Sequence, residues 1–108
     1  MLDAAREALQ FVRGRTRLDL DKDRMLALSL VKLVEIIGEA AGKVSTASQE
    51  EHGEIPWHAI VAMRNRLIHA YFDIDLDRVW DTVTDDLPPL VNQLERIFAA
   101  PYYLGAKG

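Results

Sequence analysis

Residues 25–44, MLALSLVKLVEIIGEAAGKV, decide the fold. Apolar residues recur there at steps of four and three, the spacing of one face of an α-helix. They are Leu26, Leu30, Leu33, Ile37, Ala40 and Val44. An adjacent stripe consists of Ala27, Val31, Val34, Gly38 and Ala41. A helix that is apolar over so much of its circumference needs partners on two sides. We expect the second partner to be another copy of the chain, and therefore a homodimer.

Gly38 lies in the interior of this helix, where glycine costs about 1 kcal/mol relative to alanine. The usual compensation is the close approach of another backbone. That backbone belongs either to the second copy or to another helix of the same chain, and the sequence does not favour one over the other.

Three further helices are predicted, around residues 2–13, 56–71 and 76–97, with residues 45–55 as a polar loop. Gly14 suits the end of the first of these helices, and Pro56 suits the first turn of the second. Asp75 is a candidate N-cap of the last.

Two consecutive prolines, Pro88 and Pro89, predict a kink or a short break in the last helix near residues 84–87. No strand pattern and no internal repeat accompanies the four helical segments. The economical architecture is a single all-α domain over residues 1–108, folded as an up-and-down four-helix bundle.

Composition narrows the functional classes. The chain has no cysteine, which excludes disulfides and thiolate metal sites. Charged residues interrupt the longest apolar region, so we expect no membrane span, and nothing at the N-terminus resembles an export signal. A cytoplasmic protein is the expectation.

The formal net charge of −4 argues against broad attraction to nucleic acid. Any RNA contact is then local, and the tightest cationic cluster is Arg64, Arg66 and His69.

Arg64 opens the stretch that carries candidate chemistry, residues 64–71, RNRLIHAY. It falls on an apolar stripe with Trp57, Val61, Ile68 and Tyr71. A guanidinium without a partner is costly to bury. Either a carboxylate such as Glu35 or Glu39 meets Arg64 in the core, or the stripe opens there onto a cleft or a subunit interface.

His69 follows Arg64 by five residues, which on a regular helix places the two side chains about 140° apart. They can address one target if the helix loosens near its end, or if two copies meet across a twofold axis. In such a cleft the imidazole could take the proton of a ribose 2′-hydroxyl while the guanidinium stabilises phosphoryl charge. The simpler alternative is a histidine placed at a helix end by the helix dipole.

No metal or cofactor site is expected. His52 and His58 have no partner at ligand spacing for zinc. The triplet Asp73, Asp75 and Asp77 lacks the glycine and the glutamate of a calcium loop, so we interpret it as linker and helix cap.

The stretches Ile-Gly-Glu-Ala at 37–40 and Pro-Trp-His-Ala at 56–59, with Arg-x4-His-x-Tyr at 64–71, resemble the HepT-like branch of the HEPN superfamily over nearly the whole chain. The resemblance implies a homodimer of helical bundles acting as the ribonuclease toxin of a type II toxin–antitoxin pair. Arg64 and His69 would be catalytic, with Asn65 shaping the catalytic site. The partner would be a nucleotidyltransferase antitoxin of the MntA-like type, which transfers AMP to Tyr71. The chain begins inside its first helix, so we expect a turn or more of that helix to be absent.

Two other interpretations stay open. One is a non-catalytic HEPN module that binds nucleotide or its nucleotidyltransferase partner, and the acidic charge favours it. The other is a structural bundle, which requires an intramolecular carboxylate partner for Arg64 and a fully buried Tyr71.

Overall fold

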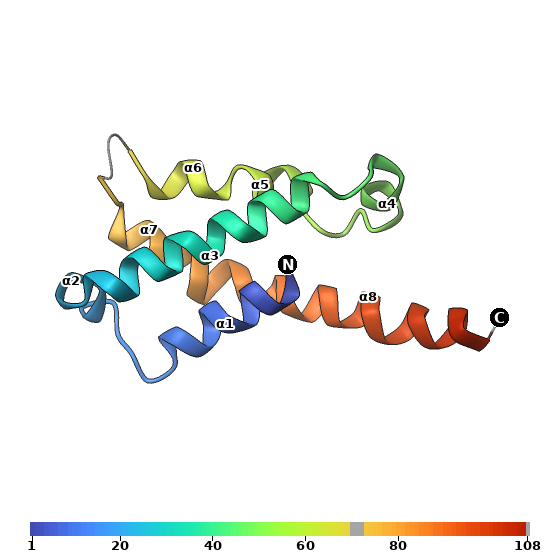
Figure 1. The fold of residues 1–108 in the computed structure, drawn as a ribbon, viewed down its shortest axis with the longest axis horizontal. Coiled ribbons are helices and arrows are strands. Elements are labelled where there is room, and N and C mark those ends of the chain that lie inside the picture. Colours follow the sequence, from blue (N-terminus) through green and yellow to red (C-terminus); the bar gives the residue numbers. More distant parts are fainter. Residues whose placement is uncertain (70–72, 108) are drawn as a thin grey trace.

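The computed structural model describes residues 1–69 and 73–107, and for residues 100–107 the backbone alone. Helices account for most of this part of the chain (Figure 1). In chain order they are α1 (Leu2–Val12), α2 (Asp19–Lys22), α3 (Arg24–Gly42), α4 (Thr46–Glu51), α5 (Trp57–Val61), α6 (Met63–Leu67), α7 (Leu76–Asp81), the π-helical segment η1 (Thr82–Asp86) and α8 (Leu87–Lys107). The all-α prediction is confirmed.

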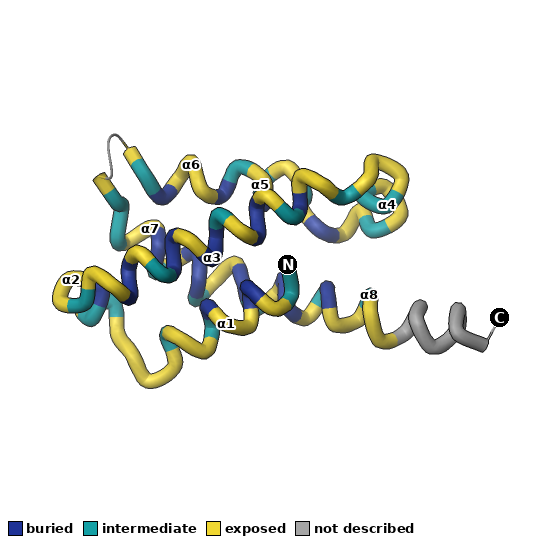
Figure 2. Tube along the Cα trace, in the orientation of Figure 1, coloured by how far each residue is buried: buried dark blue, intermediate teal, exposed yellow. Residues whose placement is uncertain are grey.

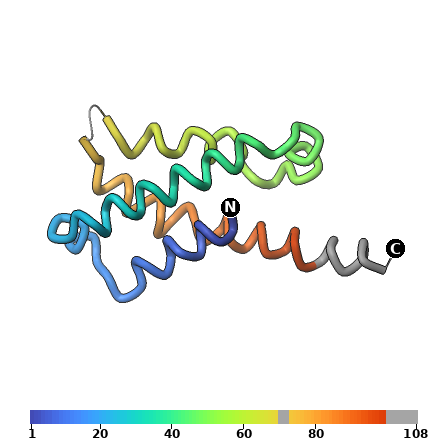
Figure 3. The backbone as a smooth tube through the Cα atoms, in the orientation of Figure 1, coloured from blue at the N-terminus to red at the C-terminus, as the bar shows by residue number. Residues whose placement is uncertain are grey.

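The chain runs up and down along α3 (Figure 3). It leaves α3, turns through α4, and returns along α3 as α5 and α6 before α7 starts the last pass. α1 packs on α3 and α8, while α5 and α6 pack on α3. The predicted bundle is therefore present, with its third and fourth helices each divided into shorter ones. No described helix has the length and apolar character needed to cross a membrane.

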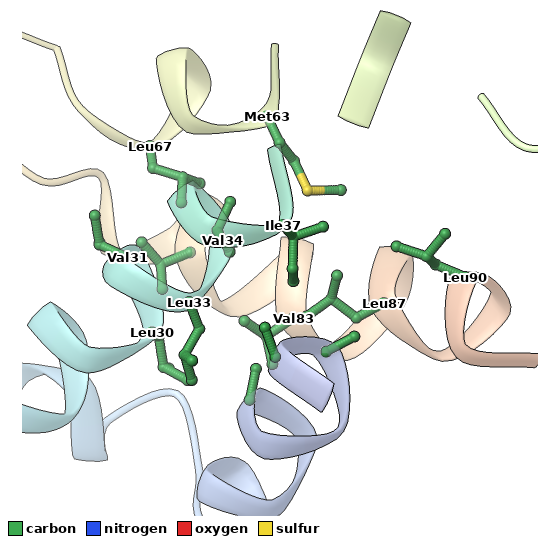
Figure 4. Packing of buried hydrophobic residues seen from close by; sticks show 14 of the residues in the cluster. Leu30, Val31, Leu33, Val34, Ile37, Met63, Leu67, Val83, Leu87 and Leu90 are labelled. Carbon is green, nitrogen blue, oxygen red and sulfur yellow. The ribbon is translucent and has the colours of Figure 1, made fainter. Parts of the chain in front are cut away.

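Both apolar stripes of α3 are buried within one chain, except that Ala40 and Val44 at the C-terminal end of the first stripe are half-buried (Figure 2). Leu30 and Leu33 lie in the core near α1, whereas Val34 lies near Met63 and Leu67 of α6 (Figure 4). The second stripe is thus covered by the chain's own helices. α3 therefore does not require a second copy of the chain, because one chain already supplies partners on two sides.

Gly38 marks where α5 crosses α3. A methyl group at Gly38 would lie 3.2 Å from the carbonyl oxygen of Ile60 and 3.4 Å from that of Val61. These distances are tight, and the neighbours are backbone atoms. Of the two interpretations of Gly38, the intramolecular crossing is confirmed.

The predicted helix over residues 56–71 is wrong in two places. It is divided at Ala62, and it ends at Leu67. Ile68 is extended, with φ −125° and ψ 121°, and forms a single antiparallel bridge with Ile74. The backbone N–H of Asp75 donates to the carbonyl of Leu67 at 2.7 Å. This cross-turn pairing stops the helix, because it turns the backbone toward partners six to eight residues away.

The break predicted in the last helix is confirmed. α7 passes through η1 into α8, and the two prolines occupy the first turn of α8. Proline has no N–H and clashes with the carbonyl one turn earlier, so the α-helical bonding pattern changes before it: the N–H of Leu87 donates to the carbonyl of Thr82, five residues earlier. The π-helical turn accommodates the break without ending the helical path. Thr84 supports it by donating from its hydroxyl to the carbonyl of Trp80 at 2.8 Å.

The loop expected over residues 45–55 contains the short helix α4. Ser45 caps it, since its hydroxyl oxygen accepts a hydrogen bond from the backbone N–H of Ser48 at 3.1 Å. The indole N–H of Trp57 donates to the carbonyls of Gln49 and His52, each at 3.1 Å. These bonds fasten α4 to the start of α5.

Candidate active site on α6 and the turn that follows

The buried face of α5 and α6 is not the one that the sequence predicts. The buried residues are Ile60, Met63 and Leu67, which recur at steps of three and four. Val61 is 46% exposed, and the side chain of Arg64 is 47% exposed. The apparent stripe through Arg64 therefore runs along the edge of the core, one position away from the true one. Arg64 is not buried. Of the two alternatives for this stripe, a charge paired in the core is therefore wrong, and the stripe opens at the surface beside two cavities.

Glu35 on α3 holds the guanidinium of Arg64. Nε of Arg64 donates to Oε2 of Glu35 at 2.8 Å, and Nζ of Lys32 lies 3.3 Å from Oε1. The bond from Arg64, followed by the one from Lys32, holds the pKa of Glu35 below its ordinary value. Among the described residues this bond is made by Nε, which leaves the terminal nitrogens of Arg64 as N–H donors for a ligand. The predicted carboxylate partner is right, but the pair lies at the surface.

Two cavities meet at Arg64. One, of about 480 Å³, lies beside Gly38 and Gly42 of α3 and is also lined by Asn65. The other, of about 420 Å³, is lined by Leu28, Ile68 and Ile74. Glu35 and Arg64 line both cavities, so the two cavities adjoin at this ion pair. We refer to the two cavities together as the groove of Arg64. Arg64 and Asn65 thus share a groove, as expected for neighbouring site residues.

His69 lies beyond the end of α6, in the turn closed by the Ile68–Ile74 bridge. Its backbone N–H donates to the carbonyl of Asp73 at 2.9 Å. The ring is 59% exposed, and its Nε2 lies 3.0 Å from Oδ2 of Asp75. In the described part of the chain, His69 lines neither cavity of Arg64. Tyr71, the predicted modification site, falls outside the described residues.

Asp75 is the residue of this site that the sequence analysis did not identify as such. Its predicted role as the N-cap of α7 is confirmed, because Oδ1 accepts the backbone N–H of Arg78 at 3.0 Å. That bond, and then the one from His69, lowers the pKa of Asp75 below its ordinary value. The sequence feature that could have indicated this contact is a carboxylate six residues after His69, on the other side of a turn. Spacing alone does not bring the two side chains together.

Metal ligands do not gather at this site or elsewhere in the described ranges, where no group of three or more histidine, aspartate and glutamate side chains is close enough to hold an ion. Asp77, the last of the aspartate triplet, accepts from Nε of Arg17 at 2.7 Å. Asp75 and Asp77 thus have helix-capping and ion-pairing roles. The predicted site residues provide three functional groups: the guanidinium of Arg64, the amide of Asn65 and the imidazole of His69.

Known proteins resemble this chain over most of its length. A family model described as ribonuclease HepT-like matches residues 1–97. "Probable ribonuclease HepT" of Thermococcus cleftensis is 34% identical over 100 residues, which cover 89% of this chain and 91% of that protein. "Putative RNase TTE0752" of Caldanaerobacter subterraneus subsp. tengcongensis is 35% identical over 89 residues, covering 82% and 80% respectively. No solved structure matches the chain significantly.

The family match includes α5, α6 and the turn that carries His69, together with the helices that support them. Each of the two alignments covers at least four fifths of this chain and at least four fifths of the relative. The resemblance drawn from residues 37–40 and 56–71 is therefore confirmed. The chain belongs to the HepT-like ribonuclease family of the HEPN superfamily.

Proposed function

We propose that this chain is a metal-independent endoribonuclease, the toxin of a type II toxin–antitoxin system. The observation that most supports the proposal is that two side chains of the motif are exposed to solvent and also held in place. Arg64 and His69 are both about half exposed, and each is held by a carboxylate, Glu35 at 2.8 Å and Asp75 at 3.0 Å. Side chains that are fixed yet open to solvent are suited to meet a ligand.

The chemistry follows from RNA carrying its own nucleophile. His69 takes the proton of a ribose 2′-hydroxyl, and the oxygen attacks the adjacent phosphorus. Arg64 stabilises the charge that builds on the phosphoryl oxygens, while Asn65 shapes the phosphate pocket. The bond to the 5′-oxygen breaks, and the products carry a 2′,3′-cyclic phosphate and a 5′-hydroxyl. None of these steps calls for a metal ion.

A second copy of the chain would complete the cleft. His69 and Arg64 do not line a common cavity in the described part of one chain, so each site needs the two side chains to meet in another way. Leu28 and Val61 border the groove of Arg64 and are 44% and 46% exposed. Apolar side chains left in water beside polar ones are typical of an interface. We infer a homodimer in which Arg64 of one chain faces His69 of the other.

The proposed regulator is a nucleotidyltransferase antitoxin that transfers AMP to Tyr71. Tyr71 follows His69 by two residues in the sequence. An AMP group there would add bulk and negative charge next to the catalytic imidazole, and it would repel RNA phosphates. The family resemblance supports this part of the proposal.

One observation favours a second candidate, a non-catalytic module that binds nucleotide or its nucleotidyltransferase partner. Glu35 and Glu39 both line the groove of Arg64, and carboxylates there oppose the approach of RNA phosphates. The first condition for a purely structural Arg64, an intramolecular carboxylate partner, is also met. The exposure of Arg64 argues against that structural role, because a guanidinium that only supports the bundle has no need of an open groove.

The test is cleavage of bulk RNA in EDTA by wild-type protein, His69→Ala and His58→Ala. His58 is exposed on α5 and provides a matched histidine control. We expect wild type and His58→Ala to cut, leaving cyclic phosphate ends, and His69→Ala to be inactive, with all three dimeric by light scattering. Cleavage by His69→Ala would refute the assigned role of His69. No cleavage by wild type, with no AMP on Tyr71 by mass spectrometry, would favour the binding module.

The regulatory part has its own test. Co-expression with an MntA-like nucleotidyltransferase is expected to add the mass of AMP to wild type but not to Tyr71→Phe, and to suppress RNA cleavage by wild type alone. Suppression of both proteins without any mass change would contradict modification of Tyr71.

A further inference from the structure

The contact between His69 and Asp75 indicates which nitrogen of the imidazole carries the hydrogen. Nε2 of His69 lies 3.0 Å from Oδ2 of Asp75, which is hydrogen-bond distance. An ionised carboxylate can accept but not donate. The pKa of Asp75 is lowered, chiefly by the backbone N–H of Arg78, so the carboxylate is ionised near neutral pH. The hydrogen between the two groups therefore belongs to Nε2.

Asp75 is itself fixed at two further points. Its other oxygen, Oδ1, accepts the backbone N–H of Arg78 at 3.0 Å, and its own backbone N–H donates to Leu67 at 2.7 Å. The backbone of His69 is tied to Asp73 across the same turn at 2.9 Å. The Ile68–Ile74 bridge closes this turn next to His69. The ring of His69 and the carboxylate of Asp75 thus lie on the same closed turn, and the cap of α7 fixes the position of the carboxylate.

We propose that Asp75 is the positioning residue of His69: it holds the imidazole in the Nε2–H tautomer, so that Nδ1 is the nitrogen that takes the proton of the ribose 2′-hydroxyl. This inference rests on the proposed ribonuclease function. A neutral imidazole with its hydrogen on Nε2 has its lone pair on Nδ1. An adjacent carboxylate also stabilises the imidazolium that forms when the proton is taken, as in the Ser-His-Asp hydrolases.

The proton and electron balance is complete. The 2′-hydroxyl gives its proton to Nδ1, its oxygen forms a bond to phosphorus, and the bond from phosphorus to the 5′-oxygen breaks. The 5′-oxygen leaves with the electron pair and takes a proton from solvent. Asp75 remains an anion throughout, and it acts through His69 without touching the RNA.

Substitution by asparagine tests the tautomer directly. The α7 cap needs an oxygen at the Oδ1 position, so in Asp75→Asn the amide nitrogen takes the Oδ2 position. There it donates to Nε2 and favours hydrogen on Nδ1, the wrong tautomer for the proposed reaction. Asparagine is an N-cap as good as aspartate, so the fold is retained.

Two more variants separate positioning from charge and from capping. Asp75→Ser keeps a capping hydroxyl but is too short to reach His69. Asp73→Asn removes one negative charge from the same turn, and its contact with His69 is through the backbone carbonyl, which the substitution leaves in place. It is the matched control.

The first readout is nitrogen NMR of the histidine rings at about pH 8.5, where an ordinary imidazole is neutral. His69→Ala assigns the signals, and His52 and His58 are internal references. We expect the Nε2–H tautomer at His69 in wild type and Asp73→Asn, a shift toward Nδ1–H in Asp75→Asn, and a mixture in Asp75→Ser. An unchanged tautomer in both Asp75 variants would overturn the proposal.

The second readout is the kinetics of RNA cleavage. Both Asp75 variants are expected to lose on the order of 10²-fold in kcat, with KM within about threefold, since Asp75 acts on the proton transfer and not on binding. Asp73→Asn should match wild type. Retained kcat in both variants, with His69→Ala inactive, would refute the role of Asp75 and leave the ribonuclease standing. If His69→Ala also cuts, the role of His69 in the proposed function fails, and NMR still decides whether Asp75 holds the ring. If wild type does not cut, the proposed function itself fails, and the NMR result stands on its own.

Discussion

The two faces of α5 and α6 differ sharply although they alternate within eleven residues. Ile60, Met63 and Leu67 point into the core and are at most 5% exposed. Val61 and Arg64 lie between them on the groove side and are about half exposed. One face holds the helices on α3, and the other presents polar groups beside two cavities. Stability and chemistry are therefore carried by different, interleaved residues and can be changed separately.

The largest expected effect is on the groove side. Arg64→Ala removes the group that stabilises phosphoryl charge, so kcat for RNA should fall by about 10²- to 10³-fold. The free energy of unfolding should change by about 0.5 kcal/mol or less, because the Arg64–Glu35 pair is exposed. Arg96→Ala on α8 removes one exposed positive charge elsewhere and should leave kcat near wild type. A comparable loss in Arg96→Ala would mean that overall charge, and not the groove, matters.

On the buried side, Leu67→Ala should reduce the free energy of unfolding by about 2–5 kcal/mol, because Leu67 is fully buried. Val61→Ala, a truncation on the exposed side, should stay within about 0.5 kcal/mol. Urea denaturation measures both. Equal losses in the two variants would contradict the division into two faces.

The helix crossing at Gly38 predicts a smaller effect. Gly38→Val must displace the backbone of Ile60 and Val61, so we expect a loss of about 1–3 kcal/mol in the free energy of unfolding. At Gly42 a new methyl group would meet the side chain of Val61 at 3.9 Å, an ordinary contact. Gly42→Val should therefore stay within about 0.5 kcal/mol. Thermal melts that rank the two variants the other way would contradict the close crossing.

The smallest effect concerns acid stability. Arg64 and Lys32 lower the pKa of Glu35, so the folded state favours the ionised form. That stabilisation is present at neutral pH and is lost as the pH falls below the ordinary value of 4.5 toward the lowered one. Glu35→Gln should melt slightly below wild type at neutral pH, and the gap should close as the pH falls from 4.5 through the lowered pKa of Glu35. A gap that widens on acidification would refute the sign.

Much of the bundle could be predicted because its signals are local. The steps of four and three along α3 report its two buried faces, and the paired prolines report the break before α8. The cap at Asp75 is also a local signal, since an N-cap bonds to a backbone group three residues later. Each of these features depends on neighbours within about one helical turn.

The site could be predicted less well because its geometry depends on distant contacts. α6 ends at Leu67 although Ile68 is apolar, because Ile68 pairs with Ile74 across a turn. Glu35 and Arg64 are 29 residues apart, and the spacing of Arg64 left open whether it lies in the core or beside a cleft. The apparent stripe at Arg64 and the true one at Met63 differ by one residue, and a short helix divided at Ala62 gives too few repeats to distinguish them.

The most direct test of the central claim, that two chains together complete the cleft, is to mix the inactive variants Arg64→Ala and His69→Ala after subunit exchange. Half of the dimers would then be mixed, and each mixed dimer would have one cleft with both side chains intact. A cleft shared by two chains should restore about a quarter of wild-type RNA cleavage. No recovery above the separate variants, with exchange verified by mass spectrometry, would contradict it and place both groups on one chain.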